Sequence, residues 1–77
     1  MKKSKLQDRY WMSPVPKTCQ LCDQVLDRSF VDGHLRALGQ WCIMCLSCHE
    51  FHGVGFGAGK GQRYDRQVDG RWLKTEG

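Results

Sequence analysis

Apolar residues gather in two short runs near the middle of the chain, at 25–31 and 40–44, and a stretch that begins with Asp32-Gly33 separates them. In the second run, Trp41 and Ile43 alternate with other residues, which places both side chains on one face of a strand. The pattern therefore predicts two antiparallel β-strands within 25–44.

The connection between these strands has two interpretations. Asp32-Gly33 is a signal for a tight two-residue turn, whereas a wider loop over 33–39 would bring the chain back further on. We favour the wider loop, because it leads the alternating residues directly into the cysteine motif that follows. His34 and Arg36 are then expected at an exposed loop tip.

A second hairpin is predicted over 62–76, with Asp69-Gly70 as its turn. A two-residue turn there places opposite charges across from each other on the two strands, which supports this register. The facing pairs are Val68 with Arg71, Gln67 with Trp72, Asp65 with Lys74 and Arg63 with Glu76.

The same register separates the side chains of this hairpin into two faces. Tyr64, Val68 and Leu73 fall on the face that we expect to point inward. Trp72 falls on the other face among charged residues, where an exposed tryptophan is a candidate for contact with a partner.

Glycine occupies every second position from Gly53 to Gly61. If this segment is extended, one of its faces carries no side chain, while the other shows residues such as Phe56 and Lys60. We expect the segment to wrap against the cysteine turns, because glycine regularly marks the close approach of two backbones. It does not fit the G-x4-G-K-[ST] frame of a nucleotide-binding phosphate loop.

Two C-x-x-C motifs carry the chemistry of the chain, and the predicted hairpin separates them. Two residues between cysteines let the backbone turn tightly, so that both sulfurs point at one cation. We expect one Zn²⁺ on Cys19, Cys22, Cys45 and Cys48. Cys42 would lie within the preceding strand as a small core residue.

Other ligand sets and cofactors remain open at this point. Cys42 with Cys45 is an alternative second pair, completed by His49 or His52, although we favour these histidines as surface residues of a short helix over 49–52 that ends at Gly53. An iron–sulfur cluster is less favoured, because the ferredoxin-type run lacks its fourth cysteine and its proline. Cys45-x-x-Cys48-His49 matches a haem attachment motif, but without the expected signal for export.

The composition explains why a metal would matter. The chain has 77 residues, with 9 glycines and 5 cysteines, and chains this short usually need a metal, disulfides or a partner for stability. An odd cysteine count, and an N-terminus that leads into no apolar run, favour thiols in a reducing cytoplasm over disulfides. No run is apolar for long enough to cross a membrane.

These elements predict a small metal-stabilised α+β fold, of treble-clef or zinc-ribbon type, with two β-hairpins and one short helix around a single zinc. Residues 1–17 form a basic arm that contains two prolines, and 18–77 form the zinc-binding domain. Within the domain we expect a knuckle at 18–23, a hairpin at 25–44, a knuckle and helix at 45–52, a glycine-rich segment at 53–61 and a hairpin at 62–76.

Several of these motifs together resemble small zinc-knuckle proteins encoded by tailed bacteriophages, most of which have no assigned function. The resemblance covers residues 18–77 and rests on the two C-x-x-C pairs, Phe30-Val31-Asp32-Gly33, Trp41, the alternating-glycine segment with Gln62-Arg63-Tyr64, and Asp69-Gly70-x-Trp72. It implies a phage-encoded protein in the host cytoplasm and agrees with Cys45 and Cys48 as the second pair. Cys42 departs from the pattern.

We expect no enzymatic activity and no small-molecule substrate, because a four-thiolate zinc has no open position and no catalytic motif is present. Docking on a host protein, such as a transcription or defence component, is slightly favoured over binding to nucleic acid. The net charge of +4 is small, and four thiolates on a divalent ion would lower it by two.

Each of the two hypotheses assigns contact residues. Trp11 and Trp72 with the glycine segment and its Phe56 would contact a protein, although Trp11 more often covers a core. The positions that would lie near phosphates are Lys2, Lys3, Lys5, Lys60, Arg63, Arg66, Arg71 and Lys74.

Overall fold

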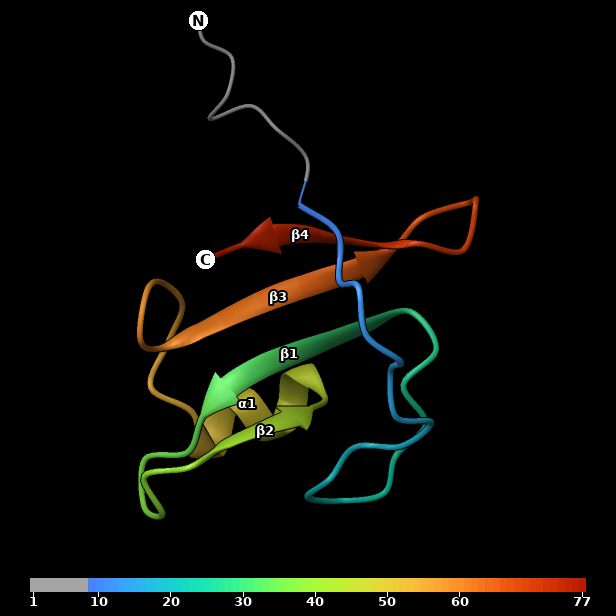
Figure 1. Cartoon of the computed structure of the whole chain (residues 1–77). Helices are drawn as coiled ribbons and strands as arrows, with labels where there is room; N and C mark the ends of the chain where they lie inside the picture. The colour runs from blue at the N-terminus through green and yellow to red at the C-terminus, as the bar shows by residue number, and fades with distance from the viewer. Residues whose placement is uncertain (1–8) are drawn as a thin grey trace, which may run out of the picture.

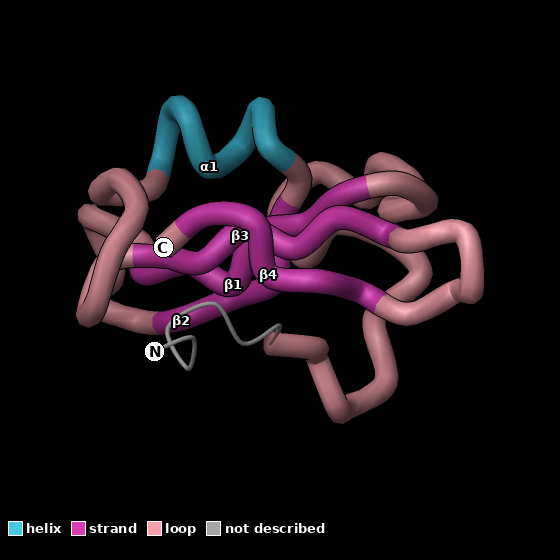
Figure 2. The backbone as a smooth tube through the Cα atoms, turned by 90° about the horizontal axis from the view of Figure 1, so that it is seen from above, coloured by secondary structure: helices cyan, strands magenta, loops and turns pink. Residues whose placement is uncertain are grey.

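The computed structural model describes residues 9–77, which form one antiparallel sheet of four strands and one short helix (Figure 1). The elements are β1 (Ser29–His34), β2 (Trp41–Met44), α1 (Leu46–His52), β3 (Gly61–Arg66) and β4 (Trp72–Glu76). The strand order across the sheet is β2-β1-β3-β4. Figure 2 shows α1 on one side of the sheet, where it contacts β1. The predicted α+β class with two hairpins and one helix is therefore confirmed.

The first hairpin has the wide loop that the sequence favours. Val31 lies opposite Met44 and His34 opposite Trp41, so Asp32 and its following glycine lie inside β1 rather than in a turn. The loop closes with a hydrogen bond from the Leu35 backbone N–H to the carbonyl oxygen of Gln40 at 2.6 Å. Arg36 lies on the exposed part of this loop, whereas His34 is half-buried against the ring of Trp41.

The second hairpin has a different turn from the predicted one. The Gln67 N–H donates to the carbonyl oxygen of Arg71 at 2.7 Å, which makes 68–70 a three-residue loop. Gly70 has a φ of 91°, a left-handed conformation that this loop type requires near its end and that glycine adopts without strain. The Asp69 carboxylate stabilises the loop by accepting from the Arg71 backbone N–H at 2.9 Å.

This turn shifts the pairing of the strands by one residue. Asp65 lies opposite Leu73, so the predicted pairing of Asp65 with Lys74 is wrong. Arg63 still lies opposite Glu76, because an irregularity between Arg63 and the next residue restores the register there. A three-residue loop gives the two strands a different register from a two-residue turn. The Asp-Gly signal alone does not tell the two turn types apart.

Four aromatic side chains form the core on the β3–β4 side of the sheet. The ring centroid of Phe30, which is fully buried, lies 5.3 Å from that of Trp11 and 5.1 Å from those of Tyr64 and Trp72. Trp11 thus covers the core, as favoured. Trp72 is not the exposed residue that the predicted register implied, and Val68, predicted to point inward, is fully exposed in the loop.

Both edges of the sheet are covered by segments from the N-terminal part of the chain. The Trp11 N–H donates to the Trp72 carbonyl at 2.9 Å, so residues 9–11 run beside β4. At the other edge, Gln20 bonds Ile43 of β2 through its backbone N–H at 3.0 Å and its side-chain oxygen at 2.7 Å. Lys2, Lys3 and Lys5, the first basic positions of the predicted arm, lie outside the described residues.

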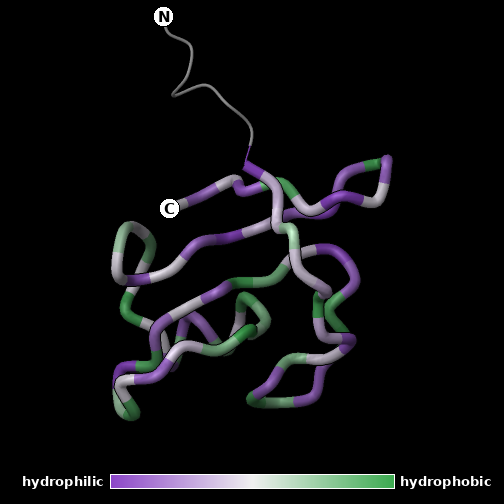
Figure 3. Tube along the Cα trace, viewed as in Figure 1, coloured by the Kyte–Doolittle hydropathy of each residue, from purple (hydrophilic) through white to green (hydrophobic). Residues whose placement is uncertain are grey.

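The glycine-rich segment is not extended as considered above. It forms a compact loop in which the Gly57 N–H donates to the Gly61 carbonyl at 2.9 Å and the Lys60 N–H donates to the Gly57 carbonyl at 3.0 Å. Figure 3 shows that β3, which follows this loop, is mostly hydrophilic, whereas β1 contains a hydrophobic stretch. Both strands are central in the sheet, but β1 is the one that α1 contacts, and more of its residues are buried than those of β3.

Candidate metal centre

The structure brings together the sulfur atoms of Cys19, Cys22, Cys45 and Cys48, all within 4.8 Å of one another. These are the four cysteines expected above, and Cys42, the alternative member of the second pair, is not among them. The first pair comes from the loop before β1, and the second pair lies at the start of α1, so the hairpin β1–β2 brings two distant segments to one point. A group of four thiols this close can hold a metal ion.

The distances fit a tetrahedral metal better than a disulfide. With metal–sulfur bonds of about 2.3 Å, the edge of a tetrahedral site is about 3.8 Å long. The sulfurs of Cys22 and Cys45 lie 3.7 Å apart. All five cysteines of the chain are free thiols.

Backbone N–H groups already point at two of these sulfurs. The sulfur of Cys19 accepts from the Cys45 N–H at 3.3 Å and from the Leu21 N–H at 3.4 Å. Burial raises the pKa of the Cys19 thiol, but the N–H donors outweigh burial and bring that pKa down to about 7. The site therefore favours a thiolate, the form that binds metal, at one of its four positions.

The second pair of cysteines, at the start of α1, has different hydrogen bonds and a different pKa shift. Cys45 is the N-cap residue of α1, and its sulfur accepts from the Cys48 N–H at 3.4 Å. Burial, together with hydrogen bonds to the neighbouring cysteines, raises the pKa of the Cys48 thiol. Because metal ligands must be deprotonated, metal binding would release this proton.

The alternative ligands lie outside the sulfur group. Cys42 is half-buried against the core, as expected of a small core residue, and burial raises the pKa of its thiol, with Cys19 and Asp32 adding to the effect. His52 is exposed at the end of α1, as predicted.

His49 is not the surface residue that the sequence favoured, since only 7% of its surface is exposed. Its ring donates from Nε2 to the Gly55 carbonyl at 2.9 Å and lies 4.5 Å from the ring of Phe56. A Cβ on Gly53 would lie 2.3 Å from the His49 ring, so the glycine segment wraps this histidine rather than the cysteine turns. In the sequence, the alternating glycines were the available signal for the burial of His49. They indicate that another group approaches the backbone closely, but they do not identify that group.

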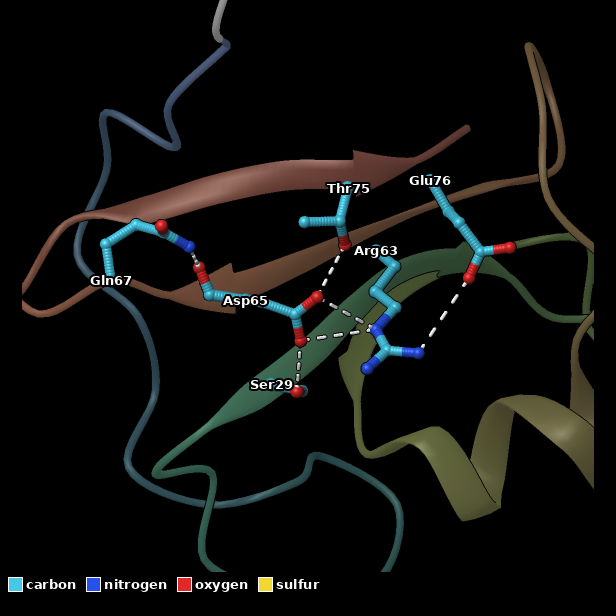
Figure 4. Close-up of polar contacts among 6 residues, drawn as sticks. All are labelled: Ser29, Arg63, Asp65, Gln67, Thr75 and Glu76. Atoms are coloured by element: carbon cyan, nitrogen blue, oxygen red, sulfur yellow. Dashed lines mark hydrogen bonds and ion pairs between the residues drawn. The ribbon is translucent and has the colours of Figure 1, made fainter.

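The candidate contact residues of the C-terminal hairpin are largely occupied within the molecule. Arg63 pairs with Asp65 at 3.2 Å and with Glu76 at 3.8 Å (Figure 4). Arg71 pairs with Asp69 at 2.9 Å and also lies over the ring of Tyr10.

The remaining candidates differ in exposure. Arg66 lies 6.0 Å from the ring centroid of Trp72, and Lys60 is exposed on the glycine loop. Lys74 is half-buried on β4, and Phe56 is half-buried against His49.

Comparison with family models, with curated proteins and with solved structures found no match to this chain. Within residues 9–77, no helix has the length and apolar character that a membrane crossing requires.

Proposed function

We propose that this chain is a structural-zinc protein of treble-clef type, which acts without catalysis by docking on a protein partner. The observation that carries the proposal is the convergence of four free thiols, from two separate motifs, within 4.8 Å. Zinc is the metal most often held by four cysteines in this spacing.

The order of the elements supports a treble clef over a zinc ribbon. A knuckle is followed by the hairpin β1–β2, and the second pair of cysteines occupies the first turn of α1. In a zinc ribbon the second knuckle would lead into another strand. Here the chain enters a helix, which ends at Gly53.

A structural role for the ion follows from its ligands and from the size of the core. Four thiolates close the coordination sphere, so no position remains where water or a substrate would be activated. Among residues 9–77, the large side chains that are fully buried are few, namely Phe30, Met44, Val31 and Cys19. Zinc binding to such a site supplies about 10–16 kcal/mol of apparent free energy, which is coupled to folding.

A protein partner is favoured over nucleic acid, because Arg63 and Arg71 already pair with carboxylates of the chain. The resemblance to phage zinc-knuckle proteins adds the proposal that the partner is a host protein in the cytoplasm, such as a transcription or defence component. Nucleic-acid binding would instead weaken steeply as salt is raised, with a slope set by the number of phosphates contacted.

Elemental analysis of the purified full chain, together with circular dichroism during chelation, tests the metal. We expect one zinc per chain and loss of the folded spectrum when a strong chelator removes it. A folded spectrum that survives complete removal of the metal would contradict a structural role, and a content far below one ion per chain would contradict the site itself.

A further inference from the structure

A hollow beside the metal centre is lined by apolar side chains from three separate segments. Its volume is about 450 Å³, and Leu21, Leu38 and Phe51 contribute to its walls. These side chains are 41%, 65% and 72% exposed. A gathering of large exposed apolar residues around one concave site is uncommon in a chain that has no partner.

The metal ligands hold two of these three segments in place. Leu21 lies between Cys19 and Cys22, and its N–H donates to the Cys19 sulfur at 3.4 Å. Phe51 lies on α1, whose first turn contains Cys45 and Cys48. The walls of the hollow are therefore positioned by the same sulfurs that would bind zinc.

The third segment is the loop between β1 and β2, which the backbone ties to the end of the helix. The Arg36 N–H donates to the carbonyl oxygen of His52 at 2.9 Å. This bond holds Leu38 and its neighbours close to Phe51, so the hollow is preformed in the folded chain.

Charge at the rim indicates what the hollow would accept. Arg36 and His52 line the hollow, and the Arg36 guanidinium carries a permanent positive charge. Among residues 9–77, no carboxylate lies within ion-pair distance of the Arg36 guanidinium. An apolar hollow with an unmatched arginine complements an apolar side chain that is next to a carboxylate.

We propose that this hollow binds a peptide segment of the partner protein that presents a large apolar side chain beside Asp or Glu. The apolar side chain packs between Leu38 and Phe51, and the carboxylate pairs with Arg36. The inference rests on the proposed docking function and deepens it, because it moves the contact surface from Trp11 and Trp72 to the metal side of the molecule. Those two tryptophans pack on Phe30 and present less free surface.

The test uses the zinc-loaded full chain as bait for a displayed library of random short peptides. Enriched peptides are synthesised, and their affinity is measured by fluorescence anisotropy against the wild type and single variants. We expect enrichment of peptides that combine a large apolar residue with Asp or Glu. Phe51→Ser, Leu38→Ser and Arg36→Glu should each weaken binding about tenfold or more.

Matched controls come from the opposite end of the molecule. Val68→Ser removes an apolar side chain that is even more exposed, and Arg28→Glu reverses an exposed charge, both away from the hollow. Neither control should change the affinity. Zinc content is measured for every variant, so that a lost metal, which concerns the proposed function, is distinguished from a lost docking site.

Three results of the peptide experiment would overturn the proposal. They are a library with no enriched peptide, enriched peptides that bind Phe51→Ser as tightly as the wild type, and enrichment of basic rather than acidic peptides. Sedimentation of the chain alone adds a further one, since self-association that Phe51→Ser abolishes would make a second copy the occupant. Oligonucleotide binding that Arg36→Glu abolishes would likewise replace a peptide with nucleic acid.

Discussion

The two halves of the sheet, the β2 side and the β4 side, are held together by different interactions. On the β2 side, the knuckle before β1 and the start of α1 meet at four sulfurs, and the surrounding apolar side chains include several exposed ones. On the β4 side, Trp11, Tyr64 and Trp72 surround Phe30, whose ring belongs to the same buried cluster as Cys19 and Cys45. β1 belongs to both sides, because Phe30 and Val31 are fully buried at the centre of the sheet.

If the four thiols hold a metal, a chain of 77 residues divides its stability between two sources. Aromatic packing stabilises one side through the removal of apolar area from water. The other side leaves Leu21, Leu38 and Phe51 in solvent, and the metal would supply the free energy that apolar burial does not. The metal side is then free to present an apolar surface, while the aromatic side is closed.

The largest expected effect is on the metal side. Cys45→Ser removes one sulfur and also changes the N-cap of α1, so we expect loss of zinc affinity and of the folded state at ordinary zinc concentrations. Circular dichroism with zinc titration measures both. Cys42→Ser is the matched control, because this cysteine lies outside the sulfur group, and a similar loss there would mean that the ligand set is wrongly assigned.

The aromatic side should respond to loss of its central ring. Phe30→Ala removes a fully buried side chain from the contacts with three other rings, and we expect it to lower the free energy of unfolding by about 3–5 kcal/mol. Urea unfolding at a fixed free zinc concentration measures this change. Val68→Ala should have almost no effect, since Val68 is fully exposed, and an equal effect of both would contradict the aromatic core.

The two sides also differ in how far the sequence predicts them. The C-x-x-C spacing limits the sulfurs to Cys19 and Cys22 with either Cys42/Cys45 or Cys45/Cys48, and the place of Cys42 within the predicted strand favours the second of these pairs. The first hairpin follows from the alternation of Trp41 and Ile43. Both signals are local, and in both cases the structure places the residues as expected.

The aromatic side depends on contacts that no local pattern contains. The predicted orientation of Trp72 was wrong because a three-residue loop replaces the two-residue turn. The loop shifts the pairing of β3 with β4 by one residue, and such a shift moves a side chain to the other face of the sheet. The burial of His49 depends on a loop that folds back from the glycine segment. Alternating glycine indicates close approach without naming the group that is approached.

The packing of His49 gives a prediction of intermediate size. Gly53→Ala would place a methyl group 2.3 Å from the His49 ring, and we expect destabilisation of about 1–3 kcal/mol from overpacking. A double-mutant cycle with His49→Ala isolates this contact, since the alanine at 53 should be better tolerated when the ring is absent. Additive effects of the two substitutions would show that the ring does not limit position 53.

The smallest expected effect concerns a polar network that joins β1, β3 and β4 (Figure 4). The Asp65 carboxylate accepts from the hydroxyls of Ser29 and Thr75 and pairs with Arg63 at 3.2 Å. Burial raises the pKa of this carboxyl, but these donors outweigh burial and lower it below the ordinary value. Since the side chain is partly exposed, we expect Asp65→Asn to lower the free energy of unfolding by about 1 kcal/mol at neutral pH.

The lowered pKa fixes the sign of the pH dependence. The ionised carboxylate stabilises the fold fully above the ordinary carboxyl pKa, and the contribution is lost as pH falls through the lowered value. The difference in stability between wild type and Asp65→Asn, measured by urea unfolding in zinc-saturated buffer, should therefore be constant near neutral pH and should shrink as the pH falls. Because both proteins keep the same sulfurs, release of zinc by acid acts on both and cancels in the difference. A difference that grew on acidification would mean that the protonated carboxyl, rather than the carboxylate, is the form that the network stabilises.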